Sequence, residues 1–92
     1  MERTAKYRRL LSRDDIPIDA VCIRVIEKDG RTLAEVEWPE NHFTIKGDYF
    51  YPTPVPLAIE RALDVKDNYG FREVVVIIDN DQLWDDAWGS LI

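Results

Sequence analysis

The sequence contains one cysteine and one histidine, and this shortage excludes several kinds of site. Cys22 alone leaves no internal disulfide, and a free cysteine within a strand usually acts as a small hydrophobic residue. His42 has no second His or Cys near it in the sequence, so no zinc-type ligand set is predicted, and no cofactor. No apolar run approaches the roughly 18 residues that a membrane span needs, and no secretory signal follows the basic N-terminus. We therefore expect a soluble, cytoplasmic protein without membrane contact.

Positive charge is also scarce, with 12 Lys and Arg against 18 Asp and Glu and a net charge of −6. Proteins that wrap a phosphate backbone need clustered Lys and Arg, so the composition argues against nucleic acid as the main partner. Residues 1–13 are the exception, because they carry +4 and leave −10 on the other 79 residues. Nucleic-acid contact through Arg8 and Arg9 is therefore a weaker alternative.

The length of 92 residues allows a single hydrophobic core. We predict one α+β domain over residues 17–92, preceded by a basic N-terminal arm over residues 1–16. Apolar residues fall loosely on one side of residues 1–13, which fits a short amphipathic helix. A flexible tail is the favoured interpretation of the arm, and docking on an acid-rich surface is the other.

A β-hairpin over residues 18–38 is the firmest local prediction. Asp29 and Gly30 stand between two alternating runs, the pattern of a two-residue type I′ turn. This turn fixes the pairing, and one face of the hairpin is then wholly apolar, whereas the other is mixed and needs partial cover. The predicted pairs are Val25–Ala34, Ile23–Val36, Val21–Trp38, Arg24–Glu35, Ile26–Leu33 and Cys22–Glu37.

The middle of the chain predicts a third strand near residues 42–46, a short fourth strand at 49–51 and then a helix. Thr53 is the expected N-cap of this helix with Pro54 at its first position, and Gly70 is the expected left-handed residue at its end. The helix should bury a stripe against the sheet, formed by Val55, Ala58, Ile59, Ala62 and Leu63.

The run Phe71–Asp79 predicts a strand buried on both faces, because Val74 through Ile78 are all β-branched and apolar. A last helix should begin at Asp79, with Gln82 completing a capping box and an apolar stripe that includes Trp84 and Trp88. The predicted fold class is α+β, in the order ββ(β)αβα. A small antiparallel sheet, made of a hairpin or meander and a return strand, carries one main helix on one face and a short C-terminal helix.

About half of the chain follows a recognisable order of elements, which is a hairpin, Phe43-Thr44 before Gly47-Asp48, and then a helix and a strand. This order resembles that of HicB-type antitoxins. The resemblance implies a protein-binding regulator, whose acidic body would suit a basic toxin.

Carboxylates that follow a buried strand are one candidate site. Several Mg²⁺-dependent families place Asp-x-Asp at such a strand end, because hard cations prefer carboxylate oxygens. Helix capping explains the same acids without a metal, so a divalent-metal enzyme or metal-binding domain is the alternative rather than the first choice. The candidate ligands are Asp79, Asp81, Asp85 and Asp86.

Aromatic residues are the stronger candidate site, because a domain of this size cannot bury all of them. Rigid aromatic side chains at a surface are frequent anchors for protein partners. Completion of the core is the competing interpretation. We therefore expect a small acidic non-enzymatic protein-interaction or regulatory module, with a protein or a second copy in a homodimer as partner. The candidate contacts are Trp38, Phe43, Tyr49, Phe50, Tyr51, Trp84 and Trp88.

Overall fold

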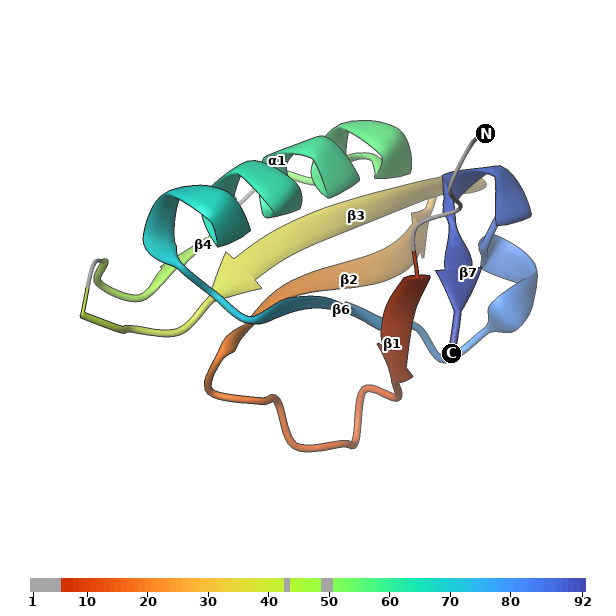
Figure 1. Ribbon diagram of the computed structural model, residues 1–92. Helices are drawn as coiled ribbons and strands as arrows, with labels where there is room; N and C mark the ends of the chain where they lie inside the picture. The colour runs from red at the N-terminus through yellow and green to blue at the C-terminus, as the bar shows by residue number, and fades with distance from the viewer. Residues whose placement is uncertain (1–5, 43, 49–50) are drawn as a thin grey trace, which may run out of the picture.

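The computed structural model describes residues 6–42, 44–48 and 51–92, which form a mixed β-sheet with one main helix packed against it (Figure 1). The strand order is β4-β3-β2-β6-β1-β7, and β5 also pairs with β3. The α+β class is therefore confirmed. The elements are β1 (Lys6–Leu10), β2 (Ala20–Lys28), β3 (Arg31–Trp38), β4 (Gly47–Asp48), β5 (Thr53–Pro54), α1 (Val55–Tyr69), β6 (Glu73–Ile77), the 3₁₀ turns η1 (Asp81–Leu83) and η2 (Asp86–Trp88), and β7 (Ser90–Leu91).

The β2–β3 hairpin has the predicted register. Asp29 and Gly30 both have positive φ, at 53° and 76°, as a type I′ turn requires. Arg24 lies opposite Glu35 and Cys22 opposite Glu37, as predicted. The predicted pairs Ile23–Val36, Val25–Ala34 and Ile26–Leu33 are also observed, whereas Val21–Trp38 is not among the paired residues. The turn chemistry therefore determined which face of the hairpin enters the core.

The prediction of an antiparallel return strand is wrong, because β6 runs parallel to β2. The chain after β3 first returns along the outside of that strand, where β4 pairs with Glu37 and Trp38 and β5 pairs with Leu33 and Ala34. Helix α1 therefore begins near the tip of the hairpin and carries the chain back to the end of the sheet where β2 starts. From there β6 can only run in the direction of β2.

Lys6–Leu10 forms a strand, so the helix expected over residues 1–13 is wrong for the described part of that segment. β1 pairs in parallel with β6 on one side and with β7 on the other. Its side chains alternate, with Tyr7 buried in the core while Lys6 and Arg8 stay exposed. Two partner strands, both distant in the sequence, therefore override the weak helical pattern.

The expected C-terminal helix is replaced by the turns η1 and η2. The side chain of Asn80 accepts a hydrogen bond from the Gln82 N–H, and that of Asp85 accepts one from the Ala87 N–H. Short polar side chains that bind nearby backbone N–H groups in this way compete with helix formation. The cap predicted at Asp79 is thus made by Asn80 one residue later.

The expected strand over residues 42–46 is also absent from its described positions, because the pairing with β3 begins at Gly47. The strand expected at 49–51 falls mainly outside the described residues. Helix α1 starts with Pro54 rather than Thr53 as its N-cap, and Gly70 ends it in the left-handed conformation with φ 70°. Its buried residues are Val55, Ala58, Ile59, Ala62 and Val65. The prediction included Leu63 instead of Val65, but Leu63 is exposed.

The core lies between α1 and one face of the sheet, and a smaller cluster is buried on the other face. Residues 11–19 connect β1 to β2 by crossing the face opposite α1 (Figure 1). This crossover loop, together with Leu10, covers Ala20, Cys22, Val75 and Ile77, which are at most 3% exposed. The mixed face of the hairpin thus receives the partial cover that its composition requires.

Candidate functional site

The crossover loop is fixed to the sheet at both of its ends. The carboxylate of Asp79 accepts hydrogen bonds from the Ser12 N–H at 2.9 Å and from the Ser12 hydroxyl at 2.7 Å. Both bonds stabilise the charged carboxylate, and they lower the pKa of Asp79. At the other end the Arg72 N–H donates to the carbonyl of Asp19 at 2.8 Å. The crossover loop is therefore anchored at its two ends, close to the two ends of β6.

An apolar cleft of about 460 Å³ lies where the crossover loop meets the end of β3. Three residues of the sheet, the crossover loop, the loop after β3 and the residue before β4 contribute to it. Most of the surface lining the cleft is hydrophobic. The lining residues are Ile16, Cys22, Glu37, Trp38, Pro39, Glu40 and Lys46.

Trp38 is held at the cleft by its contact with Gly47, to which it is paired across β3 and β4. A Cβ atom at Gly47 would lie only 2.6 Å from Cε2 and 2.9 Å from Nε1 of the indole, so no larger residue fits without displacement. Trp38 also packs against the core beneath α1. The Trp38 side chain therefore contacts the buried core and also lines the cleft.

The loop after β3 is fixed by Asn41. Its amide oxygen accepts a hydrogen bond from the Thr44 N–H at 3.0 Å, and its amide nitrogen donates to the Tyr69 carbonyl at 2.8 Å. The backbone N–H of Asn41 also donates to the carbonyl of Thr44 at 2.9 Å. These bonds attach the loop to the end of α1 and hold Ile45 beside the cleft residue Lys46.

Three isoleucines on these two loops project from the protein. The exposed fraction is 42% for Ile16, 85% for Ile18 and 77% for Ile45. Ile18 lines a neighbouring hollow that also includes Asn41, so both hollows lie between the same two loops. We refer to the cleft together with Ile16, Ile18 and Ile45 as the loop patch.

Two of the polar side chains that line the cleft are Cys22 and Glu37. Burial raises the pKa of the Cys22 thiol to about 12, with the Glu37 carboxylate adding to the shift, so the thiol is not a nucleophile at neutral pH. The Glu37 carboxylate binds the Arg24 guanidinium at 2.9 Å. The Glu37 carboxylate is therefore engaged in an ion pair.

The predicted aromatic contacts do not form one surface. Trp84 and Trp88 are only partly exposed and pack edge to face at a ring distance of 5.2 Å, with Tyr7 6.3 Å from Trp84. The Trp84 indole N–H donates to the carbonyl of Gly89 at 2.9 Å. This cluster closes the core over β1.

Among the other predicted aromatic residues, Trp38 lines the cleft and Tyr51 is exposed. Phe43, Tyr49 and Phe50 lie outside the described residues.

The acidic residues predicted as metal ligands are engaged separately. Asp79 binds Ser12, Asp81 pairs with Arg9, and Asp85 caps η2. In the described part of the chain, no three His, Cys, Asp or Glu side chains come together as a metal site would require. The arrangement thus gives the metal alternative no support, and Asp86 adds none because it is an exposed residue of η2.

Arg8 and Arg9, predicted as nucleic-acid contacts, point to opposite faces of β1. Arg8 binds the Glu73 carboxylate at 3.0 Å. Arg9 pairs with Asp81 and donates to the carbonyl of Ile78 at 3.3 Å. Both guanidinium groups thus already have acceptors, and they do not present one continuous basic surface.

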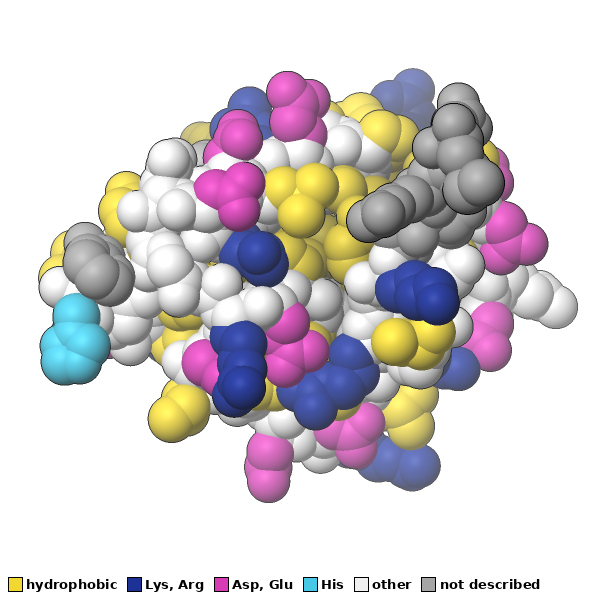
Figure 2. Space-filling view, in the orientation of Figure 1, with side chains coloured by type: hydrophobic (Ala, Val, Ile, Leu, Met, Phe, Trp, Pro, Cys, Tyr) yellow, Lys and Arg dark blue, Asp and Glu magenta, His cyan; other side chains and the backbone are white. Residues whose placement is uncertain are grey.

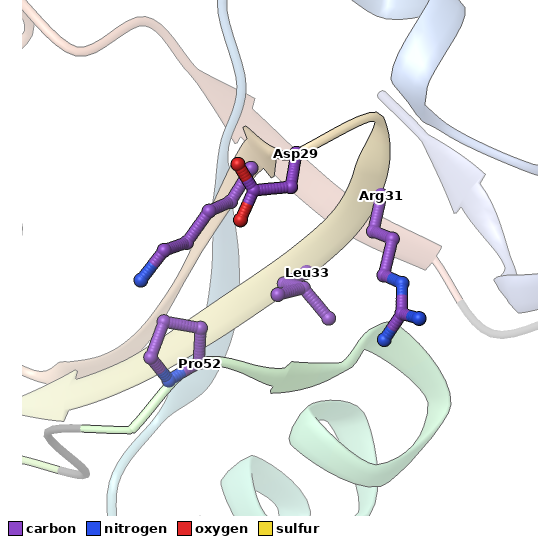
Figure 3. A pocket seen from close by; sticks show the side chains of 5 residues that line it. Asp29, Arg31, Leu33 and Pro52 are labelled. Carbon is purple, nitrogen blue, oxygen red and sulfur yellow. The ribbon is translucent and has the colours of Figure 1, made fainter.

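A further hollow of about 420 Å³ lies at the tip of the hairpin (Figure 3). Asp29 and Arg31 approach it from the turn and Pro52 from the segment before β5. The Asp29 carboxylate and the Arg31 guanidinium point away from each other in Figure 3. Since no polar groups converge there, this hollow is a weaker candidate than the cleft.

Sequence reasoning missed the loop patch. The segment Asp15-Ile16-Pro17-Ile18-Asp19 did carry a signal, because two isoleucines stand among acids and a proline where no strand partner is available. Large aliphatic residues in such a loop either cover a core or remain exposed. Ile16 lines the cleft and is also 42% exposed. The missing information was which loop meets the end of β3.

Comparison with known proteins found no matching family model, no similar curated protein and no similar solved structure. The resemblance to HicB-type antitoxins is therefore without support from these comparisons. None of the helices in the described ranges has the length and apolar character needed to cross a membrane.

Proposed function

We infer that this protein is a non-enzymatic protein-interaction module that uses the loop patch to associate with a second copy of itself. The observation that supports this most directly is the exposure of Ile16, Ile18 and Ile45 around an apolar cleft on two anchored loops. Exposed aliphatic residues scattered singly need no explanation, but a group beside a cleft marks a contact surface. Because the loops are held by hydrogen bonds, little ordering would be needed on binding.

Charge at the loop patch is compatible with a symmetric pair. Lys46 and Glu40 both line the cleft, so the patch carries one residue of each sign beside its apolar part. In a two-fold contact the same surface faces itself, and a lysine of one copy can then approach a glutamate of the other. The isoleucines would lie between these charges and become desolvated on association.

The association is tested by size-exclusion chromatography with light scattering over a range of protein concentrations. We expect the wild type to form dimers, and Ile18→Asp or Ile45→Asp to shift the equilibrium to the monomer, because a carboxylate cannot be buried in an apolar contact without a partner. Ile92→Asp is the matched control, since Ile92 is 70% exposed but lies near β1 rather than on the loop patch. A wild type that stays monomeric at every concentration, or an equal effect of Ile92→Asp, would contradict the proposal.

A further inference from the structure

A second surface hollow, distinct from the loop patch, lies between α1 and the start of β1. Its volume is about 440 Å³, and Lys6, Arg8, Lys66 and Arg72 stand around it with Glu73 as its only acidic lining residue. We call this hollow the basic groove. Figure 2 shows this side of the molecule, where Lys and Arg side chains (dark blue) lie around exposed hydrophobic side chains (yellow).

The charge of the basic groove is opposite to that of the protein. Arg8 and Glu73 pair with each other, so the lining side chains sum to +3 through Lys6, Lys66 and Arg72. The whole chain carries −6, so all the other residues together carry −9. The Arg72 guanidinium lies 3.8 Å from the Asp19 carboxylate, and the Lys66 ammonium lies 3.8 Å from the Asp67 carboxylate. These are long ion pairs at the surface, so both cations are weakly paired. A concentrated positive charge on an acidic protein attracts a negatively charged ligand to this place.

The apolar part of the basic groove distinguishes it from a simple cationic patch. Tyr7 and Val74, which are nearly buried, form its floor. Leu63 and Ile92 stand at its margin and are 38% and 70% exposed. These four residues come from four different segments of the chain. Helix α1 packs mainly against β2 and β3 rather than over β1. A ligand for the groove thus needs apolar groups as well as negative charge.

We propose that the basic groove binds an acidic peptide segment that carries aliphatic side chains among its Asp and Glu residues. A volume of this size holds a few residues of a peptide, and the carboxylates would meet the cations of the rim while an aliphatic side chain contacts the floor. Nucleic acid fits less well, since it extends beyond the groove onto a body of charge −9 and would meet no exposed aromatic ring on the groove floor. This inference concerns a different hollow from the cleft of the loop patch and does not depend on it.

Fluorescence anisotropy with a labelled peptide of alternating Glu and Leu tests the proposal. We expect saturable binding that weakens with added salt. Replacing every Glu by Lys, or every Leu by Ser, should weaken binding by at least about tenfold, because each change removes one of the two kinds of contact. Absence of binding by the Glu-Leu peptide up to millimolar protein would overturn the proposal.

Variants of the protein identify the place of binding. The pair Lys66→Glu and Arg72→Glu changes the groove charge from +3 to −1 and should weaken peptide binding at least about tenfold. Lys28→Glu with Arg31→Glu makes the same change in net charge at the hairpin tip and should alter binding by less than about twofold. Equal losses in the two double variants would mean general charge attraction and would overturn the assignment to the groove.

Two further measurements keep the test decisive. Leu63→Ser changes an exposed residue of α1 without any change of charge, so a binding loss of at least about threefold is expected even if the charge reversals disturb folding. Ile45→Asp on the loop patch should leave peptide binding unchanged, which separates the two surfaces. A single-stranded oligonucleotide that binds more tightly than the peptide, and is lost in the same groove variants, would overturn the choice of an acidic peptide.

Discussion

The two faces of the sheet are made by the same strands, yet they are covered in different ways. Among the described residues, fifteen form the buried cluster on the face beneath α1, whereas four form the buried cluster on the other face. A helix with a continuous apolar stripe covers the first, and an irregular loop of nine residues covers the second. The second face also carries the ion pairs Arg8–Glu73 and Arg24–Glu37. Helix α1 thus encloses a large buried core, whereas the crossover loop leaves an apolar cleft where it meets β3.

The difference between the faces can be measured with two adjacent valines of β6. Val75 and Val76 are both 0% exposed, but Val76 faces α1 and Val75 faces the crossover loop. We expect Val76→Ala to lower the free energy of unfolding by about 2–3 kcal/mol, since it removes two buried methyl groups from a closely packed core. Val75→Ala should cost about 1–2 kcal/mol because a loop can relax into part of the space.

Urea denaturation of both variants and the wild type gives these values. Equal costs for the two substitutions would show that the crossover loop is as rigid a cover as α1, and the contrast between the faces would then be lost. The exposed Ile18 supplies a control, because Ile18→Ala should change the free energy of unfolding by less than about 0.5 kcal/mol.

The contact of Trp38 with Gly47 sharpens the comparison at the border of the two faces. Gly47→Ala places a methyl group against the indole and should cost about 1–2 kcal/mol, because either the ring or the short strand β4 must move. In the double variant Gly47→Ala with Trp38→Leu the extra cost of the alanine should largely disappear. Strictly additive costs in denaturant unfolding would show that the two residues are not coupled.

The anchor of the crossover loop at Asp79 provides the smallest expected effect and depends on pH. Since the pKa of Asp79 is lowered in the folded protein, its contribution to stability is complete above the unfolded value of about 4. That contribution is lost as the pH falls through the folded pKa. The difference in free energy of unfolding between wild type and Asp79→Asn should therefore be largest at neutral pH and shrink on acidification.

Thermal unfolding of both proteins between neutral and acid pH measures this difference. Ser12→Ala removes one of the two hydrogen bonds to the same carboxylate, so part of the pH dependence should remain in that variant. A difference that grows on acidification would contradict the sign deduced from the lowered pKa.

Local chemistry in the sequence was sufficient wherever neighbours along the chain decide the structure. Asp29 and Gly30 fixed the hairpin register, and the spacing of Val55, Ala58 and Ile59 fixed the inner face of α1. The strand β6 was recognisable because the β-branched residues Val74 through Ile78 fall on both of its faces and require cover on both sides.

Predictions failed where distant segments decide the structure. β1 becomes a strand only because β6 and β7 flank it, and the direction of β6 depends on how β4 and β5 pair with β3. At the chain's end, Trp84 and Trp88 have helical spacing, but contacts with Tyr7 and local capping by Asp85 favour turns. The candidate site was missed for the same reason, because its two loops meet only in the folded protein.

The position of β1 between β6 and β7 has a consequence for biosynthesis. β1 is the first of the described strands to be translated, whereas both of its neighbours are translated after α1. Contacts such as that between Ser12 and Asp79 join residues 67 positions apart. A nascent chain must therefore carry β1 without its partners until β6 and β7 have been synthesised, and folding should end with the insertion of the first strand.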